Sequence, residues 1–410
     1  MAAAEETLSP APSGAGAWGE LLRAPGVPRV VTAALIARLP LGMHALGVVL
    51  LVRGQGGSYA TAGLLAAGSS LASAASGPAL GRLIDRLGQT RVLLPLALLY
   101  PTAVVGLVAA VLAGAPLALL IAVAVAVGLV QPPIPAAIRA LWPSMLPRAE
   151  LRGTAYAMEA SLQELFFVAG PLLVAVIVAA ASPAAALGVS AAAAGLGTLA
   201  FATSPPARRA GAQPGVFEPR RRGGALASAG VRTVALTSLS MGAAFGAIEV
   251  SMPAFAEAHG SRAAGGVALA AYAAGSLLGG LWVGSRPATA RPIRRYALAV
   301  GAFAAGLVLP LLAGSIPAMT LALLVAGVPI APAFAAAYGL VDALAVPGTA
   351  TEAFAWLSTS IILGLAGGTA AAGALIETAG GTDASLAMGL AAGLLGLACV
   401  AVGRRTLRPG

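Results

Sequence analysis

Twelve apolar stretches, each about long enough to cross a lipid bilayer as a helix, constrain the fold of this chain more than any other feature. A membrane-spanning α-helix needs about 20 mostly apolar residues. The first six stretches are Val30–Val52, Tyr59–Gly81, Arg91–Ala113, Pro116–Ile138, Gly153–Ala180 and Ala184–Thr203. After a segment rich in Pro, Gly and Arg, six more follow: Arg232–Ala256, Ala264–Ser285, Arg295–Ala313, Pro317–Leu340, Thr351–Glu377 and Ala384–Gly403. The stretches predict an all-α polytopic membrane protein with twelve transmembrane helices.

The composition excludes a soluble domain and several kinds of chemistry. Only 9% of the residues are charged and 59% are hydrophobic, whereas about a quarter of the residues in a soluble domain are charged. All 24 basic residues are Arg, so the chain has no lysine for a Walker A site that binds ATP. The single cysteine excludes internal disulfides and Cys-based metal clusters. We expect no cofactor, no metal and no nucleic-acid partner.

The arginines predict the orientation of the chain in the membrane, because cytoplasmic loops carry an excess of basic residues. With the N-terminus inside, 21 of the 24 arginines fall in cytoplasmic segments; Arg53 and Arg262 fall outside, and Arg38 lies within a span. We expect a multi-pass protein of the cell membrane with both termini in the cytoplasm. The expected parts are a cytoplasmic N-terminal segment (1–28), a six-helix bundle (29–203), a cytoplasmic central loop (204–231), a second six-helix bundle (232–403) and a cytoplasmic tail (404–410).

The two halves of the chain repeat each other. Gly81-x3-Asp85 has a counterpart in Gly280-x3-Gly284, 199 residues later (280 − 81). The same offset relates Gly128 and Pro133 in the fourth span to Gly327 and Pro332 in the tenth. Six helices, a loop and six more helices in the same orientation form a parallel repeat.

The segment between the second and third spans resembles the loop motif of the major facilitator superfamily. The family pattern is Gly-x3-Asp-Arg-x-Gly-Arg with further basic residues, and Gln89 stands where a basic residue is usual. The matching residues are Gly81, Asp85, Arg86, Gly88 and Arg91. The resemblance implies two six-helix bundles and a role for this loop in a conformational switch. Physically, Asp85 is an anion that can bind a helix N-terminus or an arginine and so lock one conformation. The alternative is that the arginines of this loop are only topology signals.

A second resemblance concerns the fifth span. Gly170-Pro171 resembles part of the motif of drug:proton antiporters, but the glycines that should follow are missing. The antiporter arginine in the middle of the fourth span is also missing, and we expect Arg139 at the cytoplasmic end of that span. These departures argue against a standard drug:proton antiporter.

Charged residues inside spans are costly and usually face a partner or a cavity. Arg38 is about 13 Å past Arg29 along the helix, whereas Glu159 and Glu164 are about 10 and 18 Å past Arg152. Arg38 can therefore pair with either glutamate, as a static ion pair between the first and fifth spans or as a proton-coupling site. Glu159 shares a helix face with Gln163, Phe166 and Gly170, whereas Glu164 points away from it.

His44 and Glu249 form a second candidate site. Both lie in the outer halves of their spans, the first and the seventh, which face each other in the superfamily. A contact between them would act as an outer gate that responds to pH, because histidine titrates near neutral pH. The alternative is that both side chains face outside water.

Prolines interrupt the fourth and tenth spans at corresponding positions, Pro133 and Pro332. Such interruptions indicate a substrate site or a hinge; the alternative is an ordinary kink. The candidate cavity residues are Gln131, Pro133, Gln163, Phe166, Pro332 and Trp356.

Other motifs need no function. Gly275-x3-Gly279 indicates close helix packing, as does Gly170 with Pro171. Thr349-x-x-Glu352 reads as a capping box for the eleventh span.

The predicted function is secondary active transport of a small apolar or amphipathic solute by alternating access, as proton-coupled efflux. The expected partners are the bilayer, the solute and protons, and we expect a monomer. The alternatives are an uptake symporter, a sensor that binds without translocation, and a membrane-embedded enzyme. An enzyme would need a catalytic cluster, and the two histidines are far apart in the sequence.

Overall fold

The structure is a computed structural model that describes residues 15–210, 224–286, 291–378 and 380–408. Within these ranges the chain is all helical, without strands, which confirms the predicted fold class. Residues 1–14, most of the central loop with Arg220, Arg221 and Arg222, and residues 409–410 lie outside the described residues.

The helices of the first half follow one another with short connections. They are α1 (Ala15–Arg23), α2 (Val27–Ala37), α3 (Pro40–Gly54), α4 (Tyr59–Leu87), α5 (Gln89–Leu112), α6 (Leu117–Leu129), α7 (Ile134–Met145), α8 (Ala149–Ala180) and α9 (Pro183–Ala202). Two short helices, α10 (Pro205–Arg209) and the 3₁₀-helix η1 (Gly224–Ala227), come before the second half.

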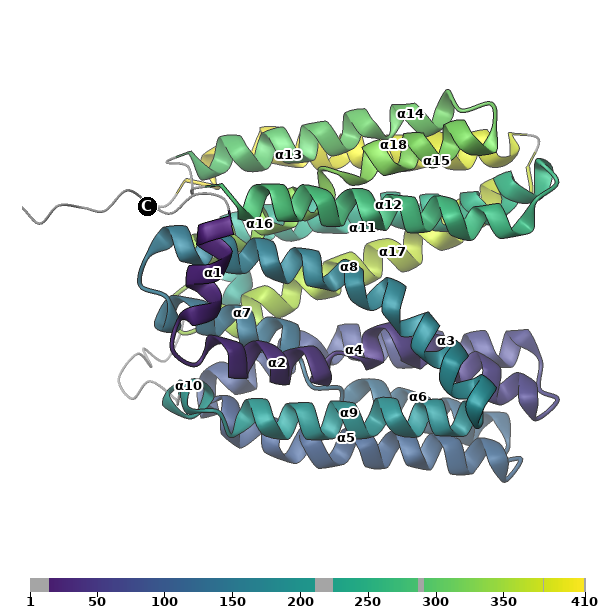
Figure 1. The fold of residues 1–410 in the computed structure, drawn as a ribbon, viewed down its shortest axis with the longest axis horizontal. Coiled ribbons are helices and arrows are strands. Elements are labelled where there is room, and N and C mark those ends of the chain that lie inside the picture. The colour runs from purple at the N-terminus through teal and green to yellow at the C-terminus, as the bar shows by residue number, and fades with distance from the viewer. Residues whose placement is uncertain (1–14, 211–223, 287–290, 379, 409–410) are drawn as a thin grey trace, which may run out of the picture.

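The second half has the same plan. Its helices are α11 (Ala229–Ala258), α12 (Arg262–Gly284), α13 (Pro292–Gly306), α14 (Val308–Leu311), α15 (Ile316–Gly327), α16 (Ile330–Leu344), α17 (Ala350–Ile376), α18 (Gly381–Val402) and the 3₁₀-helix η2 (Gly403–Arg405). Figure 1 shows the two halves as two helical layers, with α2–α9 below and α11–α18 above, and α8 crossing between them.

The two bundles contain twelve helical segments when α2 with α3, α6 with α7, α13 with α14, and α15 with α16 are each counted as one segment. Eleven of them in the described chain are long and apolar enough to cross a membrane. The twelfth is α4, whose 29 residues include several serines and glycines that lower its hydropathy. Its Ser69 hydroxyl remains satisfied, because it donates to the carbonyls of Leu65 and Ala124. Packing of α4 against α6 thus provides a hydrogen-bond partner for a polar side chain of α4 within the bundle.

The first and fourth spans differ from the sequence prediction in ways that place Arg38 and Arg139. The first was expected to be continuous but breaks between α2 and α3, where Pro40 removes a backbone donor and its ring blocks the carbonyl of Ile36. Arg38 lies at this break, as the C-cap of α2. The fourth span continues through α7 to Met145 rather than ending at Ile138, so Arg139 lies inside the span.

The repeat in the sequence corresponds to a repeat in packing. A Cβ atom added at Gly128 of α6 would lie 2.1 Å from the carbonyl oxygen of Ser69 in α4. One added at Gly327 of α15 would lie 2.1 Å from the carbonyl oxygen of Tyr272 in α12. Equivalent glycines therefore permit equivalent close helix contacts in the two bundles.

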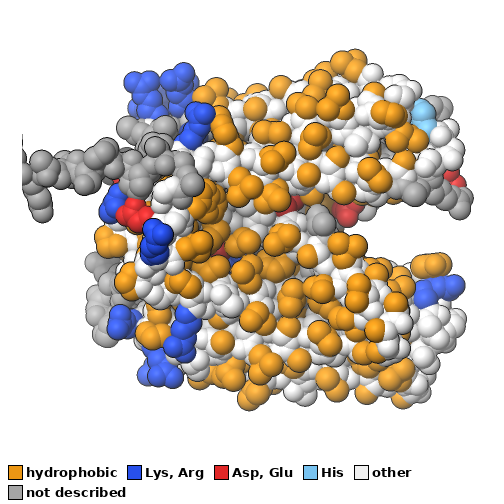
Figure 2. Space-filling view, in the orientation of Figure 1, with side chains coloured by type: hydrophobic (Ala, Val, Ile, Leu, Met, Phe, Trp, Pro, Cys, Tyr) orange, Lys and Arg blue, Asp and Glu red, His pale blue; other side chains and the backbone are white. Residues whose placement is uncertain are grey.

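The arginines gather at one end of the molecule. Figure 2 shows most of the blue side chains at the end where the chain passes from the first bundle to the second. The sides of both bundles are covered with apolar side chains, as expected of a surface that faces lipid. We call the end that carries most of the arginines the arginine-rich end.

Candidate functional site

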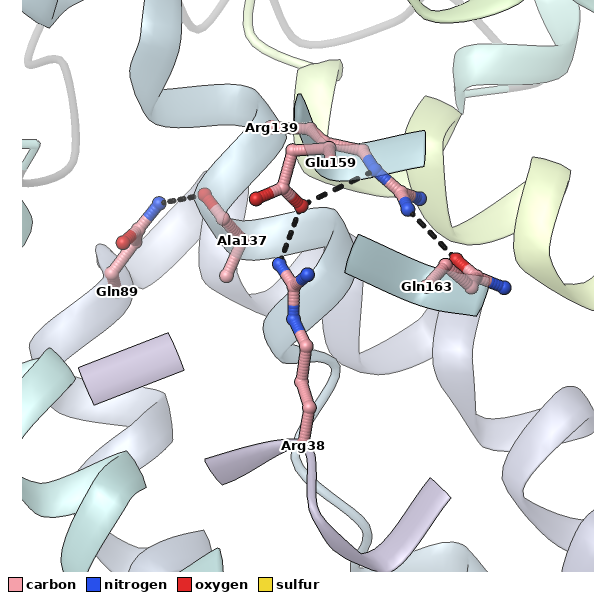
Figure 3. A network of polar contacts seen from close by, with 6 residues as sticks. All are labelled: Arg38, Gln89, Ala137, Arg139, Glu159 and Gln163. Carbon is pink, nitrogen blue, oxygen red and sulfur yellow. Dashed lines mark hydrogen bonds and ion pairs between the residues drawn. The ribbon is translucent and has the colours of Figure 1, made fainter. Parts of the chain in front are cut away.

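A buried cluster of charges lies where α2, α7 and α8 meet (Figure 3). The Nη2 atom of Arg38 donates to Oε2 of Glu159 at 2.6 Å. The Nε atom of Arg139 lies 3.9 Å from the same carboxylate oxygen, and its Nη2 atom donates to Oε1 of Gln163 at 3.2 Å. The three charged side chains are only 3%, 2% and 1% exposed, in the order Arg38, Arg139 and Glu159. We call Arg38, Arg139, Glu159 and Gln163 the central cluster.

Local structure brings these side chains together. The break before Pro40 ends α2 at Arg38, and the proline-rich break before α7 places Arg139 in the second turn of a new helix. The guanidinium of Arg139 also lies 3.9 Å from the ring centroid of Tyr338 in α16. The central cluster therefore touches both bundles.

The sequence left open which glutamate pairs with Arg38. The structure pairs it with Glu159, while Glu164 lies further along α8 and interacts with Tyr272 of α12. Sequence reasoning missed Arg139, which was expected at the end of the span and is buried inside it. The missed signal was Pro133 and Pro135, which were read as a kink or hinge and in fact start a new helix that continues to Met145.

A cavity of about 90 Å³ lies beside the central cluster, which is smaller than most small-molecule sites. Its walls come from α2, α3, α4, α5, α7, α9, α17 and the break between α6 and α7. Arg38 is the one charged residue among the described side chains that line it. Polar lining residues include Ser73, Gln131, Ser358 and Thr359, and apolar ones include Leu41 and Ile362.

The candidate cavity residues divide into two groups. Gln131 and Pro133 line the cavity. The others lie elsewhere among the described residues: Gln163 binds Arg139, Phe166 is buried, Pro332 packs near Gly279, and Trp356 is half-buried with no partner for its Nε1 atom.

Asp85 joins the two bundles at the arginine-rich end. Its Oδ1 atom accepts from the backbone N–H of Thr351 at 3.0 Å, and its Oδ2 atom accepts from that of Glu352 at 2.9 Å. Both N–H groups belong to the first turn of α17, where the helix dipole also favours an anion. Asp85 of the first bundle thus caps a helix of the second.

The capping box predicted for α17 is wrong. The Thr349 side chain makes no cap hydrogen bond and donates instead to the carbonyl of Val346. Glu352 accepts from Arg82, at 2.6 Å to Nη2 and 3.1 Å to Nε. The cap is supplied by another helix, so the local sequence does not reveal it.

The remaining residues of the loop motif have separate places. Gly81 faces α17, because an added Cβ would lie 2.9 Å from the Thr351 carbonyl oxygen. Gly88 adopts φ = 87° between α4 and α5, a conformation that favours glycine. Arg86 and Arg91 are exposed, as expected of topology signals.

Further contacts join the bundles between the arginine-rich end and the cavity. Arg152 lies 3.3 Å from Asp342, Thr154 donates to the Gly284 carbonyl at 3.3 Å, and Thr359 donates to the Ala74 carbonyl at 2.6 Å. Figure 2 shows a groove between the halves that opens at the opposite end. The bundles are therefore closed at the arginine-rich end and separated at the other.

The structure does not bring His44 and Glu249 into a described contact. His44 is half-buried and neither ring nitrogen has a hydrogen-bond partner, whereas Glu249 is exposed. The predicted outer gate would require the groove to close.

Three of the four predicted packing residues lie at close helix contacts. A Cβ at Gly170 would lie 2.4 Å from the backbone of Gly42, so α8 and α3 cross there. Gly275 and Gly279 face backbone carbonyls of Leu324 and Val328, at 2.0 and 1.8 Å from an added Cβ. Pro171 lies within α8, next to the first of these crossings.

Comparisons with known proteins identify the family. The model of the Major Facilitator Superfamily matches residues 30–298. Similar solved structures include the human organic anion transporter MFSD10 (TETRAN), at 18% identity and a TM-score of 0.70, with 92% of this chain and 99% of that chain covered. A bacterial homologue of the iron transporter ferroportin in an outward-facing state is 14% identical, with a TM-score of 0.76 and coverage of 92% and 99%. No curated protein sequence matches the chain. The chain belongs to the major facilitator superfamily and is a membrane transporter rather than an enzyme.

Proposed function

We propose that this transporter moves a small apolar or amphipathic solute out of the cell by alternating access, in exchange for protons. One observation carries the proposal: the bundles are joined through Asp85 and Thr351 at the arginine-rich end and enclose a groove that opens at the other end. Rocking of two such halves around a site between them is how transporters of repeated architecture work.

The arginine-rich end faces the cytoplasm in this proposal, because basic residues accumulate on that side of a membrane. Both termini then lie in the cytoplasm. We further propose that the protein is a monomer in the cell membrane. With this orientation, the described conformation is open to the outside and closed to the cytoplasm.

The cavity lining supports a solute with a large apolar part. Leu41, Ile362 and several prolines and alanines form most of the wall, and polar groups are few. The names of the similar structures point to different substrates, an organic anion for one and iron for another, and so favour no single class.

Flux into proteoliposomes with an imposed pH gradient tests the function. We expect a panel of amphipathic solutes to include one whose flux depends on the gradient and on the protein. The matched control is a Thr359→Cys, Ala74→Cys double variant with Cys399→Ala, because Thr359 and Ala74 are joined across the bundles at 2.6 Å. Oxidation should stop its flux and reduction should restore it. Movement of the solute in the same direction as the protons would indicate an uptake symporter. Binding of the solute without flux would indicate a sensor.

The orientation has its own test. In a Cys399→Ala background, Ala210→Cys lies at the arginine-rich end and Gln55→Cys at the opposite end. A membrane-impermeant thiol reagent added to intact cells should label only Gln55→Cys. Labelling of both variants from the same side contradicts the twelve-span orientation.

A further inference from the structure

The central cluster contains more positive than negative charge. Two guanidinium groups, Arg38 and Arg139, share the single carboxylate of Glu159. The other side chains that contact these arginines in the described structure, Gln163 and Tyr338, are neutral amide and phenol groups. A buried ion needs a partner to offset its desolvation, and here one positive charge has none.

The hydrogen bonds within the central cluster are also incomplete. The Nε atoms of both Arg38 and Arg139 are buried without a hydrogen-bond partner. An unpaired buried donor is costly, and donors on charged groups are the most costly. Arg38 lines the cavity, so a ligand in the cavity can reach the arginine that has an unused donor.

Glu164 does not balance this charge. It lies five residues beyond Glu159 on α8, which turns it about 140° around the helix axis. It lies near Tyr272 of α12, and it makes no ion pair with Arg38 or Arg139 in the described structure. Glu164 therefore faces the second bundle rather than the Arg38 side of the central cluster.

We propose that the central cluster and the cavity beside it bind an oxyanion, a carboxylate, sulfonate or phosphate group, so that the transported solute is an amphipathic anion. This inference rests on the proposed transport function, whose solute class it specifies. Guanidinium groups bind such groups through two parallel hydrogen bonds, which Arg38 can provide with its free Nε and an Nη.

Binding rearranges the pairs without leaving a charge alone. The anion takes Arg38, and Glu159 moves closer to Arg139, which is already 3.9 Å away. The two arginines, Glu159 and the bound anion thus form two ion pairs, one between Arg38 and the anion and one between Arg139 and Glu159. The apolar remainder of the solute lies against Leu41 and Ile362.

Binding of matched probes tests the proposal directly. The protein in lipid nanodiscs is mixed with naphthalene-1-acetate, its uncharged amide, or the cation 1-naphthylmethylamine, which share one apolar core. Affinity is measured by equilibrium dialysis and by the shift in melting temperature. We expect the carboxylate to bind about 10- to 100-fold more tightly than the amide, as hydrogen bonds to a charged partner allow.

Two variants locate the site. Arg38→Gln should lose most of this preference while keeping a melting temperature close to that of the unmutated protein, because Arg139 and Glu159 then balance each other. Arg29→Gln is the matched control, since Arg29 is an exposed arginine of the same helix. Glu159→Gln leaves two unpaired guanidinium groups, so it should melt at a lower temperature and recover when naphthalene-1-acetate is added.

Three outcomes overturn the inference: equal or tighter binding of the amide or amine, no binding of the carboxylate at millimolar concentration, or an Arg38→Gln variant that keeps the preference. If Arg38→Gln does not fold, the Glu159→Gln result decides: no recovery with the anion overturns the inference, and recovery supports it. Failure of the transport function looks different, because binding that depends on Arg38 would persist without flux. Conversely, flux of cations that does not need Arg38 would support the transport function and exclude an anion as the solute.

Discussion

The carboxylate of Asp85 caps a helix of the other bundle, because its Oδ2 atom accepts the backbone N–H of Glu352 at 2.9 Å. The adjacent N–H of Thr351 is bound in the same way at 3.0 Å. These two groups would otherwise be unsatisfied at the start of α17. The contact exists only while the arginine-rich ends of the two bundles are together, so it stabilises one conformation relative to the other.

Asp85→Asn should weaken this conformation. The neutral amide keeps one acceptor and loses the charge that favours the helix N-terminus, which we expect to cost about 1–2 kcal/mol of the preference for the closed arginine-rich end. Transport should slow, while the melting temperature changes little. The reporter is Ala355→Cys in a Cys399→Ala background, because Ala355 lines the cavity. A thiol reagent should reach it faster from the arginine-rich side in Asp85→Asn than in its parent.

Arg86→Gln is the control for this variant, since Arg86 is the exposed neighbour of Asp85. It should leave both transport and labelling unchanged. Unchanged labelling in Asp85→Asn itself would mean that the cap does not influence the conformational equilibrium.

The helix count and the family were readable from the sequence because they depend on local properties. Span length follows from runs of apolar residues, and it predicted the fold. Even α4, which is weakly apolar, was recognised as one of the twelve apolar stretches, Tyr59–Gly81. The partner of Arg38 was narrowed to two glutamates by helical rise alone.

The features that the sequence missed depend on residues far apart in the chain. Asp85 was expected to bind a helix N-terminus or an arginine, but the sequence did not show which, because Thr351 of α17 lies 266 residues later, and Thr349 offered a false local cap. Arg139 was expected at the membrane boundary because it directly follows the uncharged stretch that ends at Ile138, and the prolines before it were read as a kink or a hinge within the span. They instead start a new helix, which carries Arg139 into the interior.

Gly170→Ala should destabilise the protein by about 1–3 kcal/mol, the usual cost of overpacking a tight contact. An added Cβ would lie 2.4 Å from the backbone of Gly42, and backbone cannot move aside as a side chain can. Gly188→Ala is the matched control, because nothing lies within 4 Å of its added Cβ on helix α9. It should be neutral or stabilising by up to about 1 kcal/mol. Thermal unfolding in nanodiscs compares the two, and equal melting temperatures would argue against a close crossing of α3 and α8 at Gly170.

Trp18→Ala should favour opening of the arginine-rich end. The ring of Trp18 in α1 lies against Gly284 of the second bundle, where an added Cβ would come within 2.2 Å of it, so α1 touches a helix that must move away. Losing the contact should shift the equilibrium by about 1 kcal/mol, roughly fivefold. The Ala355→Cys reporter should then react faster from the arginine-rich side. Leu22→Ala, at an exposed position on the same helix, is the control and should not change the labelling rate. A similar acceleration in both variants would mean that unfolding or detachment of α1, rather than loss of the Trp18 contact, causes the effect.

The last prediction concerns the proton carrier. Glu159 is held within the central cluster, 2.6 Å from Arg38 and 3.9 Å from Arg139. Glu164 has no ion pair in the described structure and faces the second bundle near Tyr272, so it can take up and release a proton without breaking a salt bridge. We therefore expect Glu164→Gln to abolish flux driven by a pH gradient and to retain counterflow, in which solute exchanges without a gradient.

The matched control for this prediction is Glu249→Gln, since Glu249 is exposed and makes no described ion pair. It should keep both gradient-driven flux and counterflow. Glu159→Gln should instead lower the melting temperature, because it leaves two buried arginines without a carboxylate. Gradient-driven flux in Glu164→Gln that equals the flux of the unmutated protein would exclude Glu164 as the essential carrier. If Glu249→Gln lost that flux instead, the coupling proton would be carried by the second bundle.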